Sequence, residues 1–350
     1  GFLFLILIYS LYLQLLHWHL DIYLLGRIIR SLISVFIFQM IIYKVRPSLD
    51  IIFKMLIFSI LLHSFFIFLQ IIFPNPMLLI SADYVGLSYI NIILGKGNIL
   101  ISGRGFGLSS SFDMAGIINI IGMIICHYMY HYKSKTNLFY FIFILIFYIS
   151  GFFTGRTFMM IGSLLMIYIT IFFVFNGKNF FHKLYAISLI VLIFLIGVFP
   201  LIIRIILPTI DYLITGDIPG TGDAGIDNTG YYYGSLRSII DKLKLPSDLF
   251  SIIFGGEYLR DAHGDSGILK LLFSTGLIGL SLHYLFYFQL FKQFKKASSV
   301  DIYRNIIIPF FILLLIFDIK YIVMLSRGLF EFLILLLITL SLNNENRHNS

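Results

Sequence analysis

The sequence is poor in charged residues and in cysteine. Asp, Glu, Lys and Arg make up 12% of the 350 residues, about half the share found in a soluble domain, whereas apolar residues make up 59%. The mean hydropathy is +0.97. The single cysteine, Cys126, excludes a disulfide framework within the chain. Long apolar runs with so little charge exclude a soluble globular domain and indicate a chain that lies in a bilayer.

The expected fold class is all-α, a polytopic bundle of membrane-spanning helices, because lipid leaves no partner for the backbone of an open strand. About ten apolar segments have the length of one crossing. We interpret residues 1–350 as a single membrane domain. The segments lie near residues 2–18, 28–43, 51–73, 113–130, 138–153, 158–175, 184–207, 266–291, 305–325 and 328–342.

The positions of the basic residues predict how the chain is oriented. The net charge of +8 reflects these topology signals and an anionic ligand rather than nucleic acid. Basic residues, mostly lysines, follow every second segment, so both termini are expected in the cytoplasm. Two long loops, 74–112 and 208–265, then lie outside, and the second is too long to be a simple connector.

Near the expected outer membrane edges the basic residues are mostly arginine. The guanidinium group suits forked contact with phosphate oxygens, so a set of outer arginines predicts a site for a lipid-borne phosphate or pyrophosphate. The alternative is that each arginine reaches ordinary lipid headgroups. The set is Arg104, Arg156, Arg204, Arg237, Arg260 and Arg327.

Two short stretches place an arginine directly before an apolar helix. The stretch ISGRGFGLSSSFDMAG sets Arg104 among glycines, and serines 109–111 are candidate helix caps. Free backbone N–H groups at such a helix start can bind an anion, although an ordinary flexible turn gives the same pattern. In FFTGRTFMMIG the turn needs only glycine and a polar residue. Thr154 and Thr157 can cap the next helix, which leaves Arg156 for an anionic group.

The long outer loop 208–265 carries acidic and aromatic residues. The spacing of Asp217, Asp223 and Asp227 resembles that of a calcium-binding loop. Such a loop needs a glutamate at its twelfth position, and the twelfth position from Asp223 is Gly234, so no metal site is expected. The run Tyr231, Tyr232 and Tyr233 offers flat faces to a sugar or belongs to an interfacial aromatic belt. The stretch SLRSIIDKLKL, which contains Arg237, is amphipathic and predicts a helix in the membrane interface.

The stretch LRDAHGDSGILKLLFSTGLIG sets several ionisable groups before an apolar helix. Asp265 or Ser266 can cap that helix. His263 has the pKa range of a proton carrier, and Asp261 or Asp265 can orient it. Arg260 and Glu257 lie close to it in the sequence. A metal site of Asp261, His263 and Asp265 and a purely structural cap are the alternatives, but no second His or Cys cluster completes a metal shell.

These features together resemble the O-antigen polymerase and O-antigen ligase superfamily. The resemblance covers roughly residues 100–290. It consists of a helical hairpin with a TGR turn, a long outer loop, an outer-loop arginine at Arg104, and the segment HGDSGILKLLFSTGLIG with Gly276 and Gly279.

The resemblance implies a GT-C-like glycosyltransferase in the bacterial inner membrane, with its active site facing the periplasm. The donor and acceptor would be oligosaccharides linked to undecaprenyl pyrophosphate, and transfer would be inverting and free of metal and cofactor. His263 would activate the acceptor hydroxyl, with Asp261 or Asp265 as its orienting partner. The pyrophosphate candidates are Arg104, Arg156, Arg237, Arg260 and Arg327, and the substrate-binding candidates are Glu257, Ser266, Tyr231, Tyr232 and Tyr233.

We favour the polymerase over the ligase because the outer loop is polar and has a distinctive sequence. A loop that binds one particular repeat unit is expected to have these properties. Membrane lipids and a chain-length regulator are the further partners expected. The alternative of another class is a lipid-linked oligosaccharide flippase. Lys54, His63, Asp318 and Lys320 lie within apolar segments and would mark its pathway.

Overall fold

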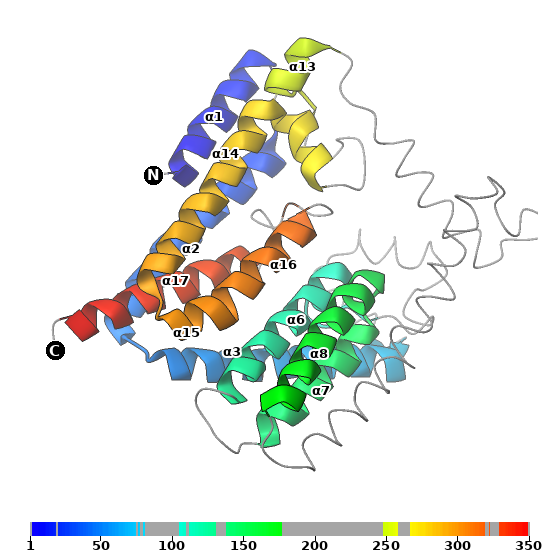
Figure 1. The fold of residues 1–350 in the computed structure, drawn as a ribbon. Helices are drawn as coiled ribbons and strands as arrows, with labels where there is room; N and C mark the ends of the chain where they lie inside the picture. Colours follow the sequence, from blue (N-terminus) through cyan, green and yellow to red (C-terminus); the bar gives the residue numbers. More distant parts are fainter. Residues whose placement is uncertain are drawn as a thin grey trace, which may run out of the picture. The chain divides into compact units, whose positions relative to one another are not determined.

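The protein is helical throughout the part of the chain that the structure, a computed structural model, describes (Figure 1). Four of the described helical segments are long and apolar enough to cross a membrane: Leu24–Val45, Leu49–Ile72, Gly267–Ala297 and Val300–Asp318. The expectation of a helical membrane protein is therefore confirmed. The described residues are 2–18, 20–74, 76–77, 80, 105–109, 112–130, 138–176, 248–257, 267–318, 322 and 329–348.

The helices coincide with most of the apolar segments expected from the sequence. The segment near 184–207 lies outside the described residues, as does most of the two long loops. The elements are α1 (Phe2–Leu16), α2 (Ile22–Val45), α3 (Leu49–Ile72), α6 (Phe112–Tyr128), α7 (Leu138–Phe152), α8 (Arg156–Asn176), α13 (Leu249–Phe254), α14 (Gly267–Ala297), α15 (Val300–Ile302), the π-helical turn η4 (Tyr303–Ile307), α16 (Ile308–Asp318) and α17 (Leu329–His348).

Local sequence signals set the ends of α2 and the start of α3. The Asp21 carboxylate accepts a hydrogen bond from the backbone N–H of Leu24 at 2.9 Å, which caps α2. The helix ends where Arg46 adopts a left-handed conformation with φ 48°, directly before Pro47, which cannot continue a helix. Ser48 then accepts from the N–H of Ile51 at 3.4 Å at the start of α3.

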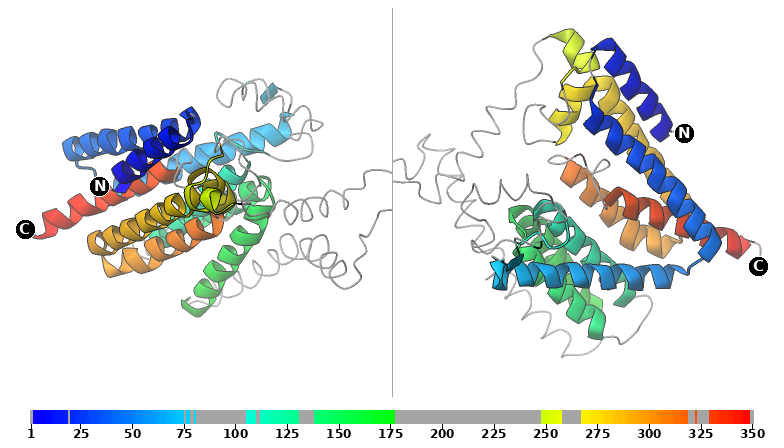
Figure 2. Two further views of the ribbon diagram at one scale, coloured as in Figure 1. Left: turned by 90° about the horizontal axis from the view of Figure 1, so that it is seen from above. Right: turned by 180° about the vertical axis from the view of Figure 1, so that it is seen from behind.

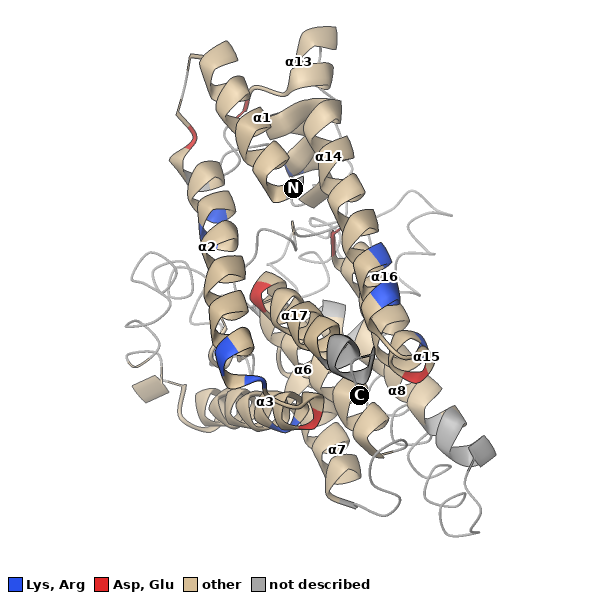
Figure 3. Ribbon diagram, turned by 90° about the vertical axis from the view of Figure 1, so that its left-hand side faces the viewer, with Lys and Arg blue, Asp and Glu red and all other residues tan. Residues whose placement is uncertain are grey.

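The chain forms two compact units: residues Gly1–Ile52 together with Gly234–Ser350, and residues Phe53–Tyr233. In the first unit α1 packs against α2 and α14, α2 packs against α17, and α14 packs against α13 and α17 (Figure 2). This unit therefore joins the two ends of the sequence. Charged residues occupy few positions along its helices, which are otherwise long uncharged stretches (Figure 3).

The second unit is built on close contacts among α6, α7 and α8. Phe147 and Phe158 are fully buried there. A Cβ at Gly122 would lie 2.6 Å from the Phe147 ring, and one at Gly162 would lie 2.7 Å from the Phe158 ring. Glycine at these positions lets the rings pack against helix backbone. Cys126 of α6 is also fully buried.

Candidate functional site

The structure leaves most of the residues predicted to act in catalysis untested. Glu257 is described and half-buried, and Arg156 is described as the first residue of α8. The predictions for the others stay predictions, because these residues lie outside the described residues: His263, Asp261, Asp265, Arg104, Arg237, Arg260, Arg327, Ser266, Tyr231, Tyr232 and Tyr233.

In the turn between α7 and α8, Thr154 bonds back to the preceding helix. Its hydroxyl donates to the carbonyl of Gly151 at 2.7 Å, and its backbone N–H donates to the same carbonyl at 2.9 Å. Thr154 therefore closes the end of α7, the preceding helix. The turn then leads directly into α8 at Arg156.

The described part of the glycine loop before α6, residues 105–109, is held by hydrogen bonds from its backbone. The N–H of Gly105 donates to the carbonyl of Phe153 at 2.9 Å. The amide oxygen of Gln70 accepts from the N–H groups of Phe106 and Gly107, both at 2.9 Å. The Nδ1 atom of His63 accepts from Leu108 at 3.0 Å.

Four consecutive amides of this loop, at residues 105–108, are thus occupied by atoms of the protein itself. The predicted anion site at the start of α6, with Arg104, stays a prediction, because Arg104 and residues 110–111 lie outside the described residues. Gln70 also donates its amide N–H to the carbonyl of Gly107 at 3.1 Å. The Gln70 side chain of α3 therefore satisfies three backbone groups of the loop, and these hydrogen bonds fix the loop against α3.

In the other unit, the chain before α14 packs against a break in that helix. Gly276 has φ 65° and ψ −173°, so α14 consists of two helical segments. A Cβ at Gly276 would overlap the carbonyl oxygen of Ile253 in α13. The N–H of Glu257 donates to the carbonyl of Phe273 at 3.1 Å, just before the break. The end of the segment that contains the predicted substrate-binding residue Glu257 is thereby anchored to α14.

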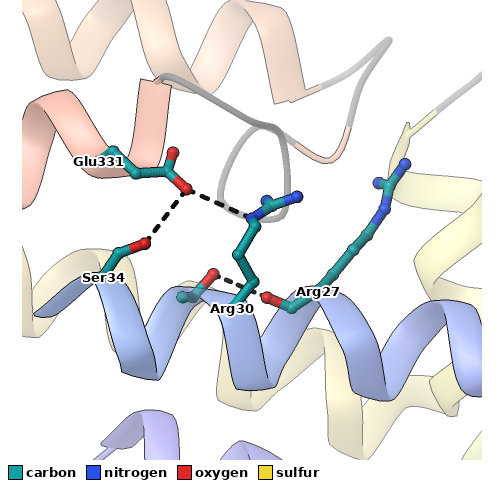
Figure 4. Close-up of polar contacts among 5 residues, drawn as sticks. Arg27, Arg30, Ser34 and Glu331 are labelled. Atoms are coloured by element: carbon teal, nitrogen blue, oxygen red, sulfur yellow. Dashed lines mark hydrogen bonds and ion pairs between the residues drawn. The ribbon is translucent and has the colours of Figure 1, made fainter. Parts of the chain in front are cut away.

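A cationic feature within an apolar helix lies on α2. Arg27 and Arg30 are three residues apart on one face of the helix, and their side chains extend from it in Figure 4. The Nε atom of Arg30 lies 3.3 Å from Oε1 of Glu331 in α17. The hydroxyl of Ser34 approaches the same oxygen at 3.5 Å. We call Arg27, Arg30, Ser34 and Glu331 the α2–α17 cluster.

The α2–α17 cluster carries two guanidinium groups and one carboxylate, so its named side chains have a net positive charge. Arg30 and Glu331 keep 26% and 20% of their side-chain surface exposed, so the pair is neither fully buried nor fully solvated. Charged residues within a membrane helix are costly and usually serve a function. Forked cations in a poorly solvated setting suit the oxygens of a phosphate or pyrophosphate group.

Sequence reasoning missed this cluster although the signal was present. The second apolar segment was placed at 28–43, which left Arg27 at its edge, whereas the candidate span begins at Leu24. The pattern Arg-x-x-Arg within an apolar helix marks one cationic face. Glu331 is likewise the acidic residue in the first turn of α17. Two helices from opposite ends of the chain meet here, and sequence spacing could not reveal that contact.

No family model, no curated protein and no solved structure matches the chain.

Proposed function

We propose that this chain is a membrane glycosyltransferase of the O-antigen polymerase class. It would transfer a growing glycan from undecaprenyl pyrophosphate to a hydroxyl of the next lipid-linked repeat unit, with inversion and without metal. The proposal includes about ten membrane crossings, a GT-C-like bundle, and both termini in the cytoplasm. The reaction would take place at the periplasmic face of the bacterial inner membrane.

The observation that carries the proposal is the pair of arginines on α2. The predicted orientation places the start of α2 at the outer face, where a lipid-linked pyrophosphate would lie. The leaving pyrophosphate gains negative charge in the transition state, and fixed guanidinium groups in a poorly hydrated site stabilise such charge. Arg27 and Arg30 add to the arginines predicted from the sequence, of which Arg156 opens a helix.

Each remaining role falls on a residue that the sequence singled out. His263 accepts the proton of the attacking hydroxyl, and Asp261 or Asp265 orients its ring. The sugar C1–O bond to the pyrophosphate breaks as the new C1–O bond forms. Glu331 is a positioning residue, because its carboxylate fixes the Arg30 side chain from the side of α17.

A second candidate function is a transporter of lipid-linked oligosaccharides. It is favoured by the break in α14 at Gly276 and by the ionisable residue Asp318, which is 2% exposed at the end of an apolar helix. Broken helices and buried ionisable groups are features of transport pathways. The two proposals differ in whether a glycosidic bond is formed.

The test uses the purified full chain in liposomes, supplied with repeat units linked to undecaprenyl pyrophosphate, with EDTA present. We expect a ladder of longer glycans. His263→Ala and the double variant Arg27→Ala/Arg30→Ala should each lower the rate about 100-fold or more. Arg30→Lys keeps the charge but loses the fork, so a smaller loss is expected. Arg304→Ala, at an exposed position in η4, is the matched control and should leave the rate unchanged.

The outcomes separate the candidates. Transfer to lipopolysaccharide core without a ladder would identify a ligase. Passage of the intact lipid-linked glycan across the liposome membrane, with no new glycosidic bond, would identify a transporter. An undiminished ladder in the folded arginine double variant would contradict the role of the α2–α17 cluster.

A further inference from the structure

A buried polar cluster joins α14 to α16. The Nε2 atom of His283 lies 3.1 Å from Oδ2 of Asp318, and the hydroxyl of Tyr287 donates to Oδ1 of Asp318 at 3.2 Å. Their exposed fractions are 3% for His283, 2% for Asp318 and 3% for Tyr287. The His283 ring also meets the Tyr287 ring edge-on, with the ring centroids 4.7 Å apart.

This cluster is costly for the fold. Asp318 is the one ionisable residue in the α16 sequence IPFFILLLIFD. A buried ion pair often adds no more stability than apolar side chains of the same volume, so a clamp between helices does not require one. Groups of this kind within membrane helices usually carry protons or ions. The surroundings of His283 show where a proton can enter.

A small cavity lies beside His283. Its volume is about 20 Å³, and Tyr9, Ser10, Thr275, Gly279 and His283 are among the residues that line it. This volume accommodates one water molecule, which needs two to four polar partners. The hydroxyl groups of Tyr9, Ser10 and Thr275 donate their hydrogens to the backbone carbonyls of Thr275, Ile6 and Leu271, so their oxygens can act only as acceptors for a water. Together with the His283 ring they offer enough partners for the two hydrogens of one water.

The break in α14 brings the Tyr9 hydroxyl to this cavity. In an unbroken helix the carbonyl of Thr275 would accept from the N–H of Gly279. Gly276 interrupts that pattern, and the hydroxyl of Tyr9 donates to the Thr275 carbonyl at 2.9 Å instead. A Cβ at Gly279 would overlap the Thr275 side chain and lie 3.2 Å from the Tyr9 ring, so glycine leaves room for both side chains here.

We propose that the cavity binds one water molecule, and that this water links the broken turn of α14 to Asp318 through His283 as a proton-transfer chain. The polar groups follow one another as Thr275 and Tyr9, the water, His283, and Asp318 with Tyr287. All belong to one compact unit of the chain. The proposal does not depend on glycosyl transfer or on the α2–α17 cluster.

The proton balance is simple. A proton carried by the cavity water passes to Nδ1 of His283, the ring nitrogen that Asp318 does not engage. The proton on Nε2 then passes to Oδ2 of Asp318, so the imidazole is neutral again and the carboxyl group holds the proton. The reverse sequence releases it to the water.

Among the described residues, the other polar groups near this chain come from α1, α14 and α16. Tyr9 approaches from α1, Tyr284 and Tyr287 belong to α14, and Asp318 comes from α16. From α2 the cavity is lined by the apolar side chains of Leu24 and Ile28. Among the described residues that line the cavity, His283 is thus the basic group that can relay a proton.

The first experiment asks whether water reaches His283. The full chain in nanodiscs is exposed to hydroxyl radicals generated from water, and modified residues are mapped by mass spectrometry. We expect His283 to be modified despite its 3% exposure, whereas Phe294, at 0% exposure, stays unmodified as the dry control. An unmodified His283 would overturn the proposal.

The second experiment asks whether the proton moves through the cavity. The ring N–H signal of His283 is followed by NMR after transfer to D₂O, with His283→Gln identifying the signal. Ser10→Leu fills the cavity and should slow the exchange at least tenfold. Leu285→Ala changes an exposed side chain of α14 that does not line the cavity, and it should leave the exchange rate unchanged.

Tyr9→Phe provides a second route to the same conclusion if Ser10→Leu fails to fold. It keeps the ring and removes the hydroxyl, and it should also slow the exchange. If His283 and Asp318 only clamp two helices, these variants change the melting temperature and leave the exchange rate as in the wild type. That result would refute the proton path.

Discussion

The two units of the molecule treat their buried polar groups in different ways. In the unit that contains α6–α8, Ser64, Asn119 and Ser150 join three helices through neutral hydrogen bonds of 2.9–3.1 Å. The other unit also contains pairs of oppositely charged or ionisable side chains, of which His283–Asp318 is buried and Arg30–Glu331 is half-buried. Neutral networks specify packing at modest cost, whereas ionisable groups cost more and can exchange a ligand or a proton.

The backbones of the two units also differ: hydrogen bonds close a loop in one unit, and a helix is interrupted in the other. The glycine loop of residues 105–108 is held by hydrogen bonds to described atoms at every amide, through Gln70, His63 and Phe153. In the other unit the backbone of α14 is interrupted at Gly276, and a side chain of α1 serves one of the freed carbonyls. One unit therefore provides a closed scaffold, and the other provides a spanning helix with a break.

The largest effect is expected where the break is removed. Gly276→Ala places a Cβ on a residue with φ 65° and against the carbonyl of Ile253. Strain and overpacking together should lower the free energy of unfolding by about 3 kcal/mol. Thermal unfolding in detergent measures the loss. Gly26→Ala is the matched control, because no atom lies within 4 Å of its Cβ, and no loss of stability is expected there.

The closed loop of the other unit is expected to be the next most sensitive place. Gln70→Leu leaves the N–H groups of Phe106 and Gly107 without their acceptor in a buried site. The free energy of unfolding should fall by about 2 kcal/mol. Gln39→Leu removes an exposed amide and should change stability by less than about 0.5 kcal/mol. Equal effects in the two variants would mean that Gln70 does not hold the loop.

The neutral network should show coupling of moderate size. Ser150→Ala removes hydrogen bonds to Ser64 and Asn119 and should cost about 1 kcal/mol. Combined with Ser64→Ala in a double-mutant cycle, it should give a coupling energy of at least about 0.5 kcal/mol. Ser59→Ala, on the exposed side of α3, is the control: combined with Ser150→Ala, its effect on stability should simply add. Additivity between Ser64 and Ser150 would show that the network does not act as one unit.

The smallest effect concerns acid and the short helix α13. Hydrogen bonds from the Ser251 side chain and backbone hold the pKa of the Asp248 carboxyl below its usual value. A lowered folded-state pKa contributes stability above the usual carboxyl pKa, and this stability is lost as the pH falls below about 4. Amide hydrogen exchange in α13, corrected for intrinsic rates, should therefore speed up on acidification. Asp248→Asn keeps the cap without titrating, so its corrected exchange should stay flat.

Much of the fold could be predicted from the sequence, because few backbone structures can span a lipid bilayer. Apolar length and helix signals placed α3 at 51–73 where the helix is Leu49–Ile72, and they placed α14 at 266–291 where it begins at Gly267. The end of α14 was missed by six residues, because Lys292, Lys295 and Lys296 were read as the loop that follows it. Helix periodicity does not stop at a charged residue.

The contacts on which the proposals rest were harder to predict. The pairs Arg30–Glu331 and His283–Asp318 join residues 301 and 35 positions apart, and no local pattern gives their partner. Gly276 was recognised as part of a motif but not as a break, because a glycine in a helix usually costs stability without ending the helix. Gln70 was overlooked, because one amide that bonds three loop groups looks in sequence like any polar residue near a helix end.

The buried thiol of Cys126 has a practical consequence. It is the one cysteine of the chain and is fully buried in α6, so a maleimide reagent should find almost no native target in the folded protein. The natural sequence is therefore a ready background for single-cysteine mapping. A cysteine placed at Trp18, which is 95% exposed, and another at Val300, which is 80% exposed, would report which side of a sealed vesicle each position faces, without removing any native residue elsewhere.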